Sequence, residues 1–153
     1  MSQQGSAPPS HRVHASCIAF GARGVLLRGA PGSGKSDLAL RCLETLTPPA
    51  RLVADDQVLI EARDGGLVAS APERISGLLE VRGVGIIAVD PKAEVPLALI
   101  ADMAARESVP RLPPDPLPCE DMLGVALPVI VLCPFEASAP VKLRLAVERL
   151  PGP

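Results

Sequence analysis

The stretch Gly29–Ser36, which reads GAPGSGKS, decides the fold that we expect for this chain. It matches the pattern G-x-x-x-x-G-K-[ST] at every specified position, and this pattern is typical of a phosphate-binding loop. The glycines let the backbone bend so that successive N–H groups converge on an anion, and the N-terminus of a following helix adds a partial positive charge. Lys35 can bridge the outer phosphates of a nucleotide, and the hydroxyl of Ser36 can ligate Mg²⁺.

The residues that flank this loop have the matching pattern. Val25–Leu27 is an apolar run that predicts a strand, and residues 36–46 carry apolar side chains at helical spacing. Pro48 and Pro49 end the predicted helix. A chance glycine-rich turn is the alternative, but the full pattern should arise by accident in roughly one per cent or fewer of chains this long. We therefore predict that the chain binds a nucleoside triphosphate with Mg²⁺, while the phosphate acceptor stays open.

The composition excludes several classes of function. The chain has 153 residues, which suits one domain, and 15 Lys and Arg against 17 Asp and Glu give a formal net charge of −2. Without a broad cationic field, duplex DNA and anionic membrane surfaces are poor partners. The chain has two phenylalanines and no Trp or Tyr, which leaves little for stacking recognition of single-stranded nucleic acid. We therefore expect neither nucleic acid nor a membrane among the partners.

The first residues and the cysteines favour a cytoplasmic protein. Residues 1–10 are polar and lack the basic and apolar regions of a signal peptide, so we expect a disordered tail and then one domain over residues 11–150. No apolar run reaches the length of about 18 residues that spans a bilayer. The four cysteines are widely spaced, which favours reduced and mostly buried thiols over disulfides or a metal site.

Short apolar runs separated by turn residues predict a sheet that is rich in hairpins. We expect the α/β class, as a single domain with a mixed sheet and flanking helices, because hairpins are too frequent for strictly alternating βαβ units. The segment after Ser138 favours a helix but also alternates as in a strand. The expected strands are residues 14–20, 25–28, 51–54, 57–63, 67–71, 85–89, 95–103 and 128–133, the expected helices are 36–46, 73–79 and the segment after 138, and 106–121 is a proline-rich loop.

An aspartate pair, Asp55 and Asp56, follows the predicted strand 51–54, about 20 residues after Lys35. Neighbouring residues of an extended chain point to opposite faces, so we expect one of the two to face the phosphates. A carboxylate at that place can hold Mg²⁺ or accept a proton from an attacking hydroxyl. A turn-forming pair that caps the next element is the alternative.

Glu80, Arg82 and His14 are further candidates for the site. In an extended segment Glu80 and Arg82 share one face, where they can supply a metal ligand and a phosphate contact, although a surface ion pair is the alternative. His14 lies on the predicted strand before the loop. Because an imidazole titrates near neutrality, it suits an acid, a base or a phosphate contact, but a lone histidine on a strand is more often structural.

In this order, the loop, the aspartate pair and the segment Leu79–Ile87 (LEVRGVGII) resemble the catalytic domain of the HPr kinase/phosphorylase family. The resemblance runs from His14 to about Val89 and is specific, because few families with such a loop continue with VADD and then E-[IV]-R-G-x-G. It implies a P-loop kinase fold of the type shared by HPr kinase and phosphoenolpyruvate carboxykinase. Members use ATP to phosphorylate a serine of HPr, a small phosphocarrier of the sugar phosphotransferase system, and can reverse the step.

The resemblance also implies roles for the site residues. Asp56 corresponds to the base that takes the proton from the target serine, and His14 and Lys35 correspond to active-site residues. Ser36 and Glu80 correspond to the Mg²⁺ ligands. Together with Arg82 as a phosphate contact, the residues expected to bind ATP are Gly29, Ala30, Pro31, Gly32, Ser33, Gly34, Lys35 and Ser36.

The chain departs from the family pattern in its last third. Met122 stands where the family has an active-site arginine, and Pro134–Ala139 stands where the family has a segment with two arginines. Such arginines stabilise charge on the transferring phosphoryl group, so the resemblance gives little support to the reverse phosphorylase reaction. Arg82 and Arg111 are candidates to compensate. The chain is similar to short proteobacterial versions, whose target is an HPr-like carrier of a regulatory phosphotransferase system.

Three functions agree with these residues. The first is an ATP- and Mg²⁺-dependent serine protein kinase that acts on an HPr-like phosphocarrier protein. The second is a nucleotide-binding regulatory protein with little or no kinase turnover, which the missing arginines and the proline-rich segment favour. The third is a small-molecule kinase, against which the short chain argues because it leaves little room for an enclosing lid. The resemblance favours the first function and implies assembly as a hexamer.

Overall fold

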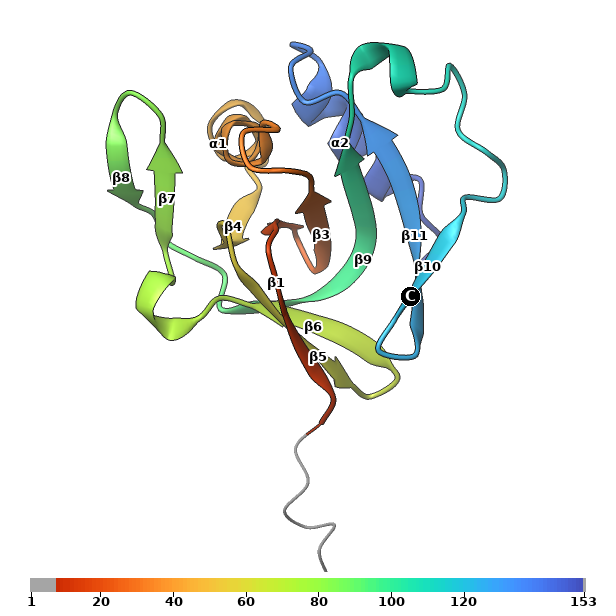
Figure 1. Ribbon diagram of the computed structural model, residues 1–153, viewed down its shortest axis with the longest axis horizontal. Coiled ribbons are helices and arrows are strands. Elements are labelled where there is room, and N and C mark those ends of the chain that lie inside the picture. Colours follow the sequence, from red (N-terminus) through yellow and green to blue (C-terminus); the bar gives the residue numbers. More distant parts are fainter. Residues whose placement is uncertain (1–7, 153) are drawn as a thin grey trace, which may run out of the picture.

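A curled, mixed sheet forms the centre of the computed structural model, which describes residues 8–152 (Figure 1). Its strands follow the order β1-β5-β6-β9-β3-β2-β4, and β11 pairs with both β9 and β10. The strands of this sheet are β1 (Ser10–Val13), β2 (Ser16–Phe20), β3 (Arg23–Arg28), β4 (Arg51–Ala54), β5 (Val58–Arg63), β6 (Gly66–Ser70), β9 (Glu94–Met103), β10 (Cys119–Met122) and β11 (Val125–Leu132).

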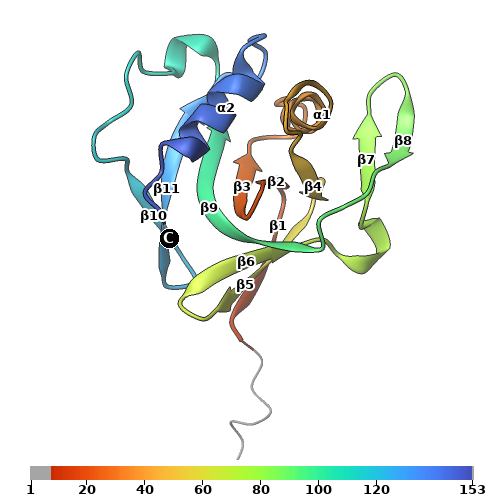
Figure 2. The same cartoon turned by 180° about the vertical axis from the view of Figure 1, so that it is seen from behind.

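Strand β9 connects the two halves of the sheet. Its first residues pair antiparallel with β6, where Pro96 lies opposite Val68. Its later residues pair in parallel with β3 and β11, so that Ile100 lies between Leu26 and Val129. Because one long strand belongs to both halves, the sheet bends along it, and the β5–β6 hairpin turns across the other strands (Figures 1 and 2).

Four strands end at the same edge of the sheet. Strands β3, β9 and β11 are parallel neighbours, and β4 runs in the same direction as β3 because each of them is antiparallel to β2. In open α/β sheets, ligands bind outside the carboxyl ends of the strands. The segments that leave this edge after β3, β4 and β11 begin at Gly29, Asp55 and Cys133.

Two helices cover one face of this sheet, α1 (Lys35–Thr45) and α2 (Ala139–Glu148) (Figures 1 and 2). Leu38 and Cys42 of α1 and Leu143 and Val147 of α2 are buried in one core cluster. Each leucine or valine side chain contributes about 1.5–3 kcal/mol when it is fully buried. Of the three predicted helices these two are confirmed, and α1 begins one residue earlier than expected. Ser138 precedes α2, but its side chain makes no capping hydrogen bond.

A second core cluster fills the other face, between the central strands and the β5–β6 hairpin. The side chains of neighbouring strand residues alternate between the two clusters, as the period of an extended chain requires. Ile18 and Val25 belong to the first cluster, whereas Cys17 and Leu26 belong to the second. Both faces of β3 are therefore covered, and this explains why the run before the phosphate loop is apolar throughout.

Three sequence predictions about the elements are wrong. The predicted helix at residues 73–79 is a single 3₁₀ turn, Glu73–Ile75, because Gly77 takes the left-handed backbone conformation and a strand starts at Leu78. The last residues of the predicted loop 106–121 are part of a strand, because β10 begins at Cys119. The predicted strand 14–20 starts only at Ser16, so His14 lies in a bend between β1 and β2 rather than on a strand.

The predictions for the first residues and the cysteines have mixed outcomes. Residues 1–7 of the predicted disordered tail lie outside the described residues, but Ser10 already begins β1, which pairs with β5. Three of the four cysteines are buried, as predicted, and all four are free; Cys119 is exposed. Between residues 8 and 152, no helix is both long and apolar enough to cross a membrane.

A separate two-stranded hairpin, β7 (Leu78–Val81) and β8 (Gly85–Ala88), stands beside α1 (Figures 1 and 2). Leu79 attaches the hairpin to the body, because its side chain is buried in the core cluster under α1. The tip behaves differently: Val84 and Ile86 are 74% and 68% exposed. The hairpin therefore has a buried base and an apolar, solvent-facing tip.

Candidate active site

The loop Gly29–Ser36 connects β3 to α1 and lines a cavity of about 630 Å³. The ammonium group of Lys35 donates hydrogen bonds to the carbonyl oxygens of Gly29 at 2.7 Å and Ala30 at 3.0 Å. These two bonds fold the lysine over its own loop and bury it. A cationic side chain, free N–H groups and a helix N-terminus thus converge on one place, which is the arrangement that binds phosphate.

Two glycines of the loop are required by geometry. Gly34 has a φ of 101°, a left-handed conformation that other residues rarely adopt. A Cβ atom there would lie 3.0 Å from Cγ of Pro134 and 3.2 Å from Cε1 of Phe135. A Cβ atom at Gly29 would lie 2.4 Å from Oγ of Ser33. A side chain at either glycine would therefore collide with residues packed against the loop.

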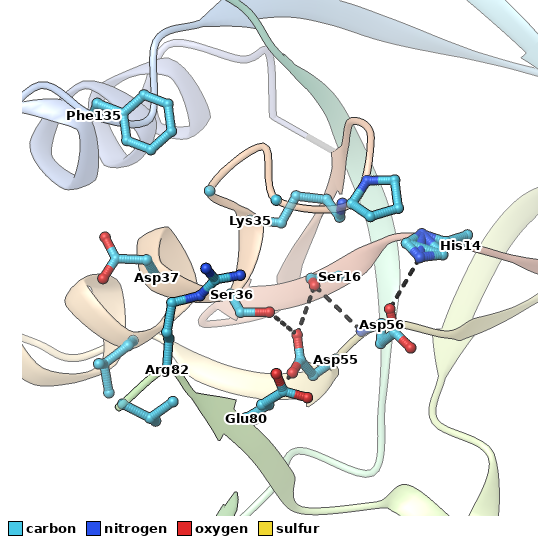
Figure 3. A pocket seen from close by; sticks show the side chains of 15 residues that line it. His14, Ser16, Lys35, Ser36, Asp37, Asp55, Asp56, Glu80, Arg82 and Phe135 are labelled. Atoms are coloured by element: carbon cyan, nitrogen blue, oxygen red, sulfur yellow. Dashed lines mark hydrogen bonds and ion pairs between the residues drawn. The ribbon is translucent and has the colours of Figure 1, made fainter. Parts of the chain in front are cut away.

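Asp55 is the buried centre of the site (Figure 3). Its Oδ1 accepts hydrogen bonds from the hydroxyls of Ser36 at 2.7 Å and Ser16 at 2.9 Å, and its Oδ2 accepts one from the backbone N–H of Glu80 at 3.2 Å. These three donors come from α1, β2 and β7. A single carboxylate therefore connects the phosphate loop, the sheet and the β7–β8 hairpin.

Asp56 faces the same cavity but is exposed, and its carboxylate lies 3.0 Å from Nε2 of His14. Its φ of 71° turns it out of the extended conformation, and its backbone is held by Ala15 and by the hydroxyl of Ser16. This turn corrects the expectation that only one of the two aspartates would face the phosphates. Alternation of faces holds for an extended chain, and Asp56 is not extended, so both aspartates line the cavity.

The β7–β8 hairpin supplies Glu80 and Arg82 from the opposite wall. Glu80 is in β7, and Arg82 is the first residue of the turn after it, so the two do not share one strand face as expected. Both nevertheless line the cavity, and Figure 3 shows the guanidinium group of Arg82 extending toward Ser36 at the start of α1. The hairpin thus brings one carboxylate and one cation to the phosphate loop.

The oxygen donors of the cavity fit a magnesium ion. Mg²⁺ prefers oxygen ligands, keeps several waters, and is bound by one or two carboxylates together with substrate phosphates. Ser36, Asp55 and Glu80 present a hydroxyl and two carboxylates at the phosphate loop. Residues 8–152 contain no group of three or more His, Cys, Asp or Glu side chains that could hold a metal ion.

Most of the predicted site residues line the cavity, whereas Gly29, Ala30 and Ser33 of the loop do not. Arg111 is not among the residues that line the cavity, whereas Arg82 is. Gly29 and Ala30 bind Lys35 through their carbonyl groups, and the buried hydroxyl of Ser33 has no hydrogen-bond partner. The predicted residues that line the cavity are His14, Pro31, Gly32, Gly34, Lys35, Ser36, Asp56, Glu80 and Arg82.

Sequence reasoning missed Ser16 and Phe135 and assigned Asp55 no separate role. Ser16 is the first residue of β2, and its place at the carboxyl edge follows from the antiparallel pairing with β3, which no local pattern reveals. Phe135 lines the cavity from the segment after β11. Its signal was its rarity, because it is one of only two aromatic residues in the chain.

Arg28, the last residue before the loop, holds three strands together below it. Its guanidinium group donates to both carboxylate oxygens of Asp102, at 2.8 and 3.0 Å, and to both of Glu120, at 2.6 and 2.8 Å. Hydrogen bonding to Arg28 holds the pKa of Glu120 below its ordinary value of 4.5. The ion pairs connect β3 to β9 and β10, so they support the starting point of the phosphate loop.

Comparison with known families agrees with this geometry. Residues 6–92, more than half of the chain, match the family model of the HPr serine kinase C-terminal domain. The chain belongs to this family. The match ends shortly after the β7–β8 hairpin, so it includes every element that contributes Lys35, Asp55, Asp56 and Glu80 to the cavity. The resemblance expected from the loop, the aspartate pair and the hairpin segment is thereby confirmed.

Curated relatives of this HPr serine kinase C-terminal domain match just over half of the chain. The HPr kinase/phosphorylase of Clostridium botulinum (strain Eklund 17B / Type B) is 42% identical over 81 residues, which is 53% of this chain and 26% of that protein. The HPr kinase/phosphorylase of Geobacillus sp. (strain WCH70) is 49% identical over 80 residues, which is 52% of this chain and 25% of that protein. The match thus spans about a quarter of the length of these relatives.

A solved structure extends the likeness beyond the matched segment. The HPr(Ser) kinase/phosphatase from Coxiella burnetii superimposes with a TM-score of 0.74 and 25% sequence identity, over 90% of this chain and 88% of that chain. Because 90% of the chain is covered, the likeness extends well past residue 92, where the family match ends. The predicted P-loop kinase fold with a mixed sheet and flanking helices is confirmed for this HPr serine kinase C-terminal domain.

Proposed function

We propose that this protein is an ATP- and Mg²⁺-dependent kinase that phosphorylates a serine of an HPr-like phosphocarrier protein. The observation that carries the proposal is the placement of Asp56, with His14 at 3.0 Å, in the same cavity as the phosphate loop. A group that can accept a proton and a site that can hold a triphosphate are what transfer to a hydroxyl requires. The family membership and the names of the relatives support the same activity.

The phosphates of ATP bind at the loop. The backbone N–H groups and the N-terminus of α1 accept the anion, and Lys35 exchanges its two loop carbonyls for phosphate oxygens. Arg82 approaches from the hairpin turn and is the arginine placed to stabilise negative charge on the transferring group. Arg111, the other arginine considered for this role, is outside the cavity lining.

Ser36, Asp55 and Glu80 are the residues that would hold Mg²⁺. The bound ion supplies positive charge that neutralises the phosphate oxygens and orients them for transfer. The protein's own part is to fix these ligands. Asp55 accepts from Ser36 and from the backbone of Glu80, so the donor groups from α1 and β7 keep their positions in the free protein.

Asp56 orients the serine hydroxyl of the carrier and accepts its proton. Its side chain is 67% exposed, so a hydroxyl on another protein can reach it. His14 donates to the same carboxylate when its Nε2 carries the proton, and thereby fixes its orientation. Asp55 is buried and hydrogen-bonded on both oxygens, which leaves Asp56 as the base.

The surroundings of the cavity favour a protein acceptor over a small molecule. The hairpin tip beside the site exposes Val84 and Ile86, and exposed apolar side chains next to a site are typical of macromolecular contacts. A small-molecule kinase needs walls that enclose its substrate, whereas Asp56 and His14 are about half or more exposed. We therefore assign the hairpin tip to the docking of the carrier protein.

One observation favours the second function, a nucleotide-binding regulatory protein with little turnover. Met122, at the place of the family's active-site arginine, is a buried apolar side chain of the second core cluster, so it supplies no positive charge to the transferring group. Pro134–Ala139 also contains no arginine. The kinase direction can rely on Arg82, Lys35 and Mg²⁺, but the proposal does not include the reverse phosphorylase reaction.

Transfer of labelled phosphate tests the proposal. The protein is incubated with Mg²⁺, ATP labelled at the γ-phosphate, and an HPr-like carrier from the same organism, with a Ser→Ala carrier as the matched control. We expect label on the unmodified carrier alone, and none with Lys35→Ala. Normal ATP binding without any labelled carrier would contradict the kinase and select the regulatory protein. Label on a small molecule instead would select the third function.

The proposed activity implies a location in the cell, and the family resemblance implies a state of assembly. A kinase that uses ATP and a phosphocarrier works in the cytoplasm, where both are found. Assembly as a hexamer stays a prediction from the family resemblance. The mass of the protein in solution, measured by light scattering, tests it: six times the chain mass agrees with the prediction, and a monomer contradicts it.

A further inference from the structure

Phe135 is an aromatic side chain in an unusual place. It is 71% exposed, although large apolar side chains are normally buried, and it is one of two aromatic residues in the chain. It follows the end of β11 and lines the same cavity as the phosphate loop. Nothing in the phosphate-binding or proton-accepting machinery requires an aromatic ring, so its presence there needs a separate reason.

The backbone around Phe135 is fixed to the helix that follows the phosphate loop. The guanidinium group of Arg41 in α1 donates to the carbonyl oxygen of Pro134 and, at 3.1 Å, to that of Glu136, so it holds the residues on both sides of Phe135. The same guanidinium group pairs with Asp37 in the first turn of α1 at 2.9 Å. The position of the ring is therefore set relative to the loop before any ligand binds.

The ring also lies close to the loop itself. Pro134 and Phe135 pack against Gly34, where an added Cβ atom would lie 3.0 Å from the proline and 3.2 Å from Cε1 of the phenylalanine. Gly34 is the residue immediately before Lys35 and the start of α1. An exposed aromatic face thus stands at the edge of the place that receives the phosphates, within a cavity of about 630 Å³, a volume typical of small-molecule sites.

The sheet order places Phe135 on the opposite side of the loop from Asp56, the proposed proton acceptor. Strand β11 lies on one side of β3 and β4 lies on the other, so the segments after these strands flank the loop from opposite sides. Figure 3 shows Phe135 and the His14–Asp56 pair on opposite sides of Lys35. The terminal phosphate of a bound nucleotide has to face Asp56 for transfer, so the nucleoside extends the other way, toward Phe135.

We infer that Phe135 is the surface on which the purine base of the bound nucleoside triphosphate stacks. The inference rests on the proposed function to the extent that the loop binds a triphosphate. Aromatic rings stack on bases because every base has a flat π-face, and truncating such a ring weakens binding by about 5- to 100-fold. Arg41 acts as a positioning residue, because it holds the backbone on both sides of Phe135 and does not itself contact the purine.

Calorimetric titration with two ligands tests the inference. Mg²⁺-ATP carries a base and Mg²⁺-tripolyphosphate does not, while both can occupy the loop. We expect Phe135→Leu to weaken ATP binding at least about fivefold and to leave tripolyphosphate binding unchanged. Phe20→Leu is the matched control, since Phe20 lies outside this cavity, and it should bind both ligands normally. Unchanged ATP binding by Phe135→Leu, or an equal loss for both ligands, would overturn the inference.

Fluorescence gives a second, independent measurement. The chain contains no Trp or Tyr, so Phe135→Trp introduces a single reporter. Stacking predicts that saturating ATP quenches or shifts its emission, that tripolyphosphate does not, and that Phe20→Trp responds to neither. The same response to tripolyphosphate as to ATP would show that the reporter senses the loop rather than the base, and would contradict the inference.

Failure of this inference and failure of the proposed function give different results. If the protein is not a kinase, the difference between ATP and tripolyphosphate persists although no carrier is labelled. If Phe135 does not hold the base, the carrier is labelled although Phe135→Leu binds ATP as the unmodified protein does. Binding and transfer are therefore measured on the same variants.

Discussion

At the scale of single residues, two adjacent aspartates have opposite environments. Asp55 is buried and accepts three hydrogen bonds, whereas Asp56 is exposed and lies beside His14. The left-handed φ of Asp56 separates them, because it turns the second carboxylate out of the strand and into the open cavity. In the proposed function, Asp55 therefore supports the structure and the metal site, and Asp56 accepts the proton.

The two aspartates should differ in their effect on stability. Asp55→Ala leaves two hydroxyls and one backbone N–H without their acceptor, and we expect a loss of about 2–4 kcal/mol in the free energy of unfolding. Asp56→Gly removes the strain of the left-handed conformation and should keep or raise that free energy, by about 1 kcal/mol at most. Urea unfolding measures both, and equal losses for the two variants would contradict the distinction.

The thiols give a further prediction at this scale. Burial raises the pKa of the Cys42 thiol to about 12 and that of Cys17 even further, and Cys133 is also buried. Because the thiolate is the reactive form, a disulfide reagent should modify one thiol quickly in the folded protein, Cys119, and all four only after unfolding. Cys119→Ser should abolish the fast reaction. A second thiol that reacts at a comparable rate would contradict the buried core.

At the scale of elements, ion pairs and a hairpin position the site from two sides. Arg28 connects β3 to β9 and β10 below the loop, and Leu79 fixes the β7–β8 hairpin to the body beside it. The first connection carries charge and therefore depends on pH, whereas the second depends on apolar burial. Substitutions in the ion pairs should therefore change stability in a way that depends on pH, whereas substitutions in the hairpin should not.

The contribution of Glu120 to stability should disappear in acid. Since Arg28 lowers the pKa of Glu120 in the folded protein, the ionised pair stabilises the fold above the ordinary value of 4.5 and is lost as the pH falls through the lowered pKa. We expect Glu120→Gln to cost about 1 kcal/mol near pH 7 and progressively less as the pH falls below 4.5. Glu107→Gln, at an exposed position, is the control. A cost that does not change with pH would contradict the ion pair.

Substitutions in the hairpin tip should weaken binding of the carrier protein and leave binding of the nucleotide unchanged. Val84→Ser with Ile86→Ser removes the exposed apolar contacts while Leu79 keeps the hairpin in place. We expect the KM for the carrier protein to rise about tenfold, with unchanged affinity for ATP, because apolar contacts at a protein interface contribute about 1 kcal/mol or more each at their centre. Steady-state kinetics measures the first value and calorimetry the second. Equal KM values would exclude the tip from docking.

At the scale of the whole molecule, the local patterns predicted the loop, both long helices and most strands. The loop pattern and apolar spacing are properties of neighbouring residues, so the sequence contains them directly. The bend at His14, the left-handed turn at Asp56 and the position of Phe135 depend on how distant strands pair. The helix predicted at 73–79 failed for the same reason, since Leu79 is needed in the core as part of a strand.

The directions of the strands in the whole sheet explain the position of the site. Parallel pairing of β3, β9 and β11, with β4 in the same direction, brings the loop, the aspartates and Phe135 to one edge although they are far apart in the sequence. In the proposed function, the phosphates lie between Asp56 as the proton acceptor on one side and Phe135 on the other. Transfer of the terminal phosphate toward Asp56 is the central claim of this arrangement.

The rate of phosphate transfer to the carrier by Asp56→Asn tests that claim most directly. Asparagine has the same size as aspartate and tolerates the left-handed backbone, but it cannot accept the proton of the serine. We predict a rate at least about 100-fold lower than that of the unmodified protein, with the same affinity for Mg²⁺-ATP. An Asp56→Asn variant that binds ATP normally and phosphorylates the carrier at the unmodified rate would contradict the claim.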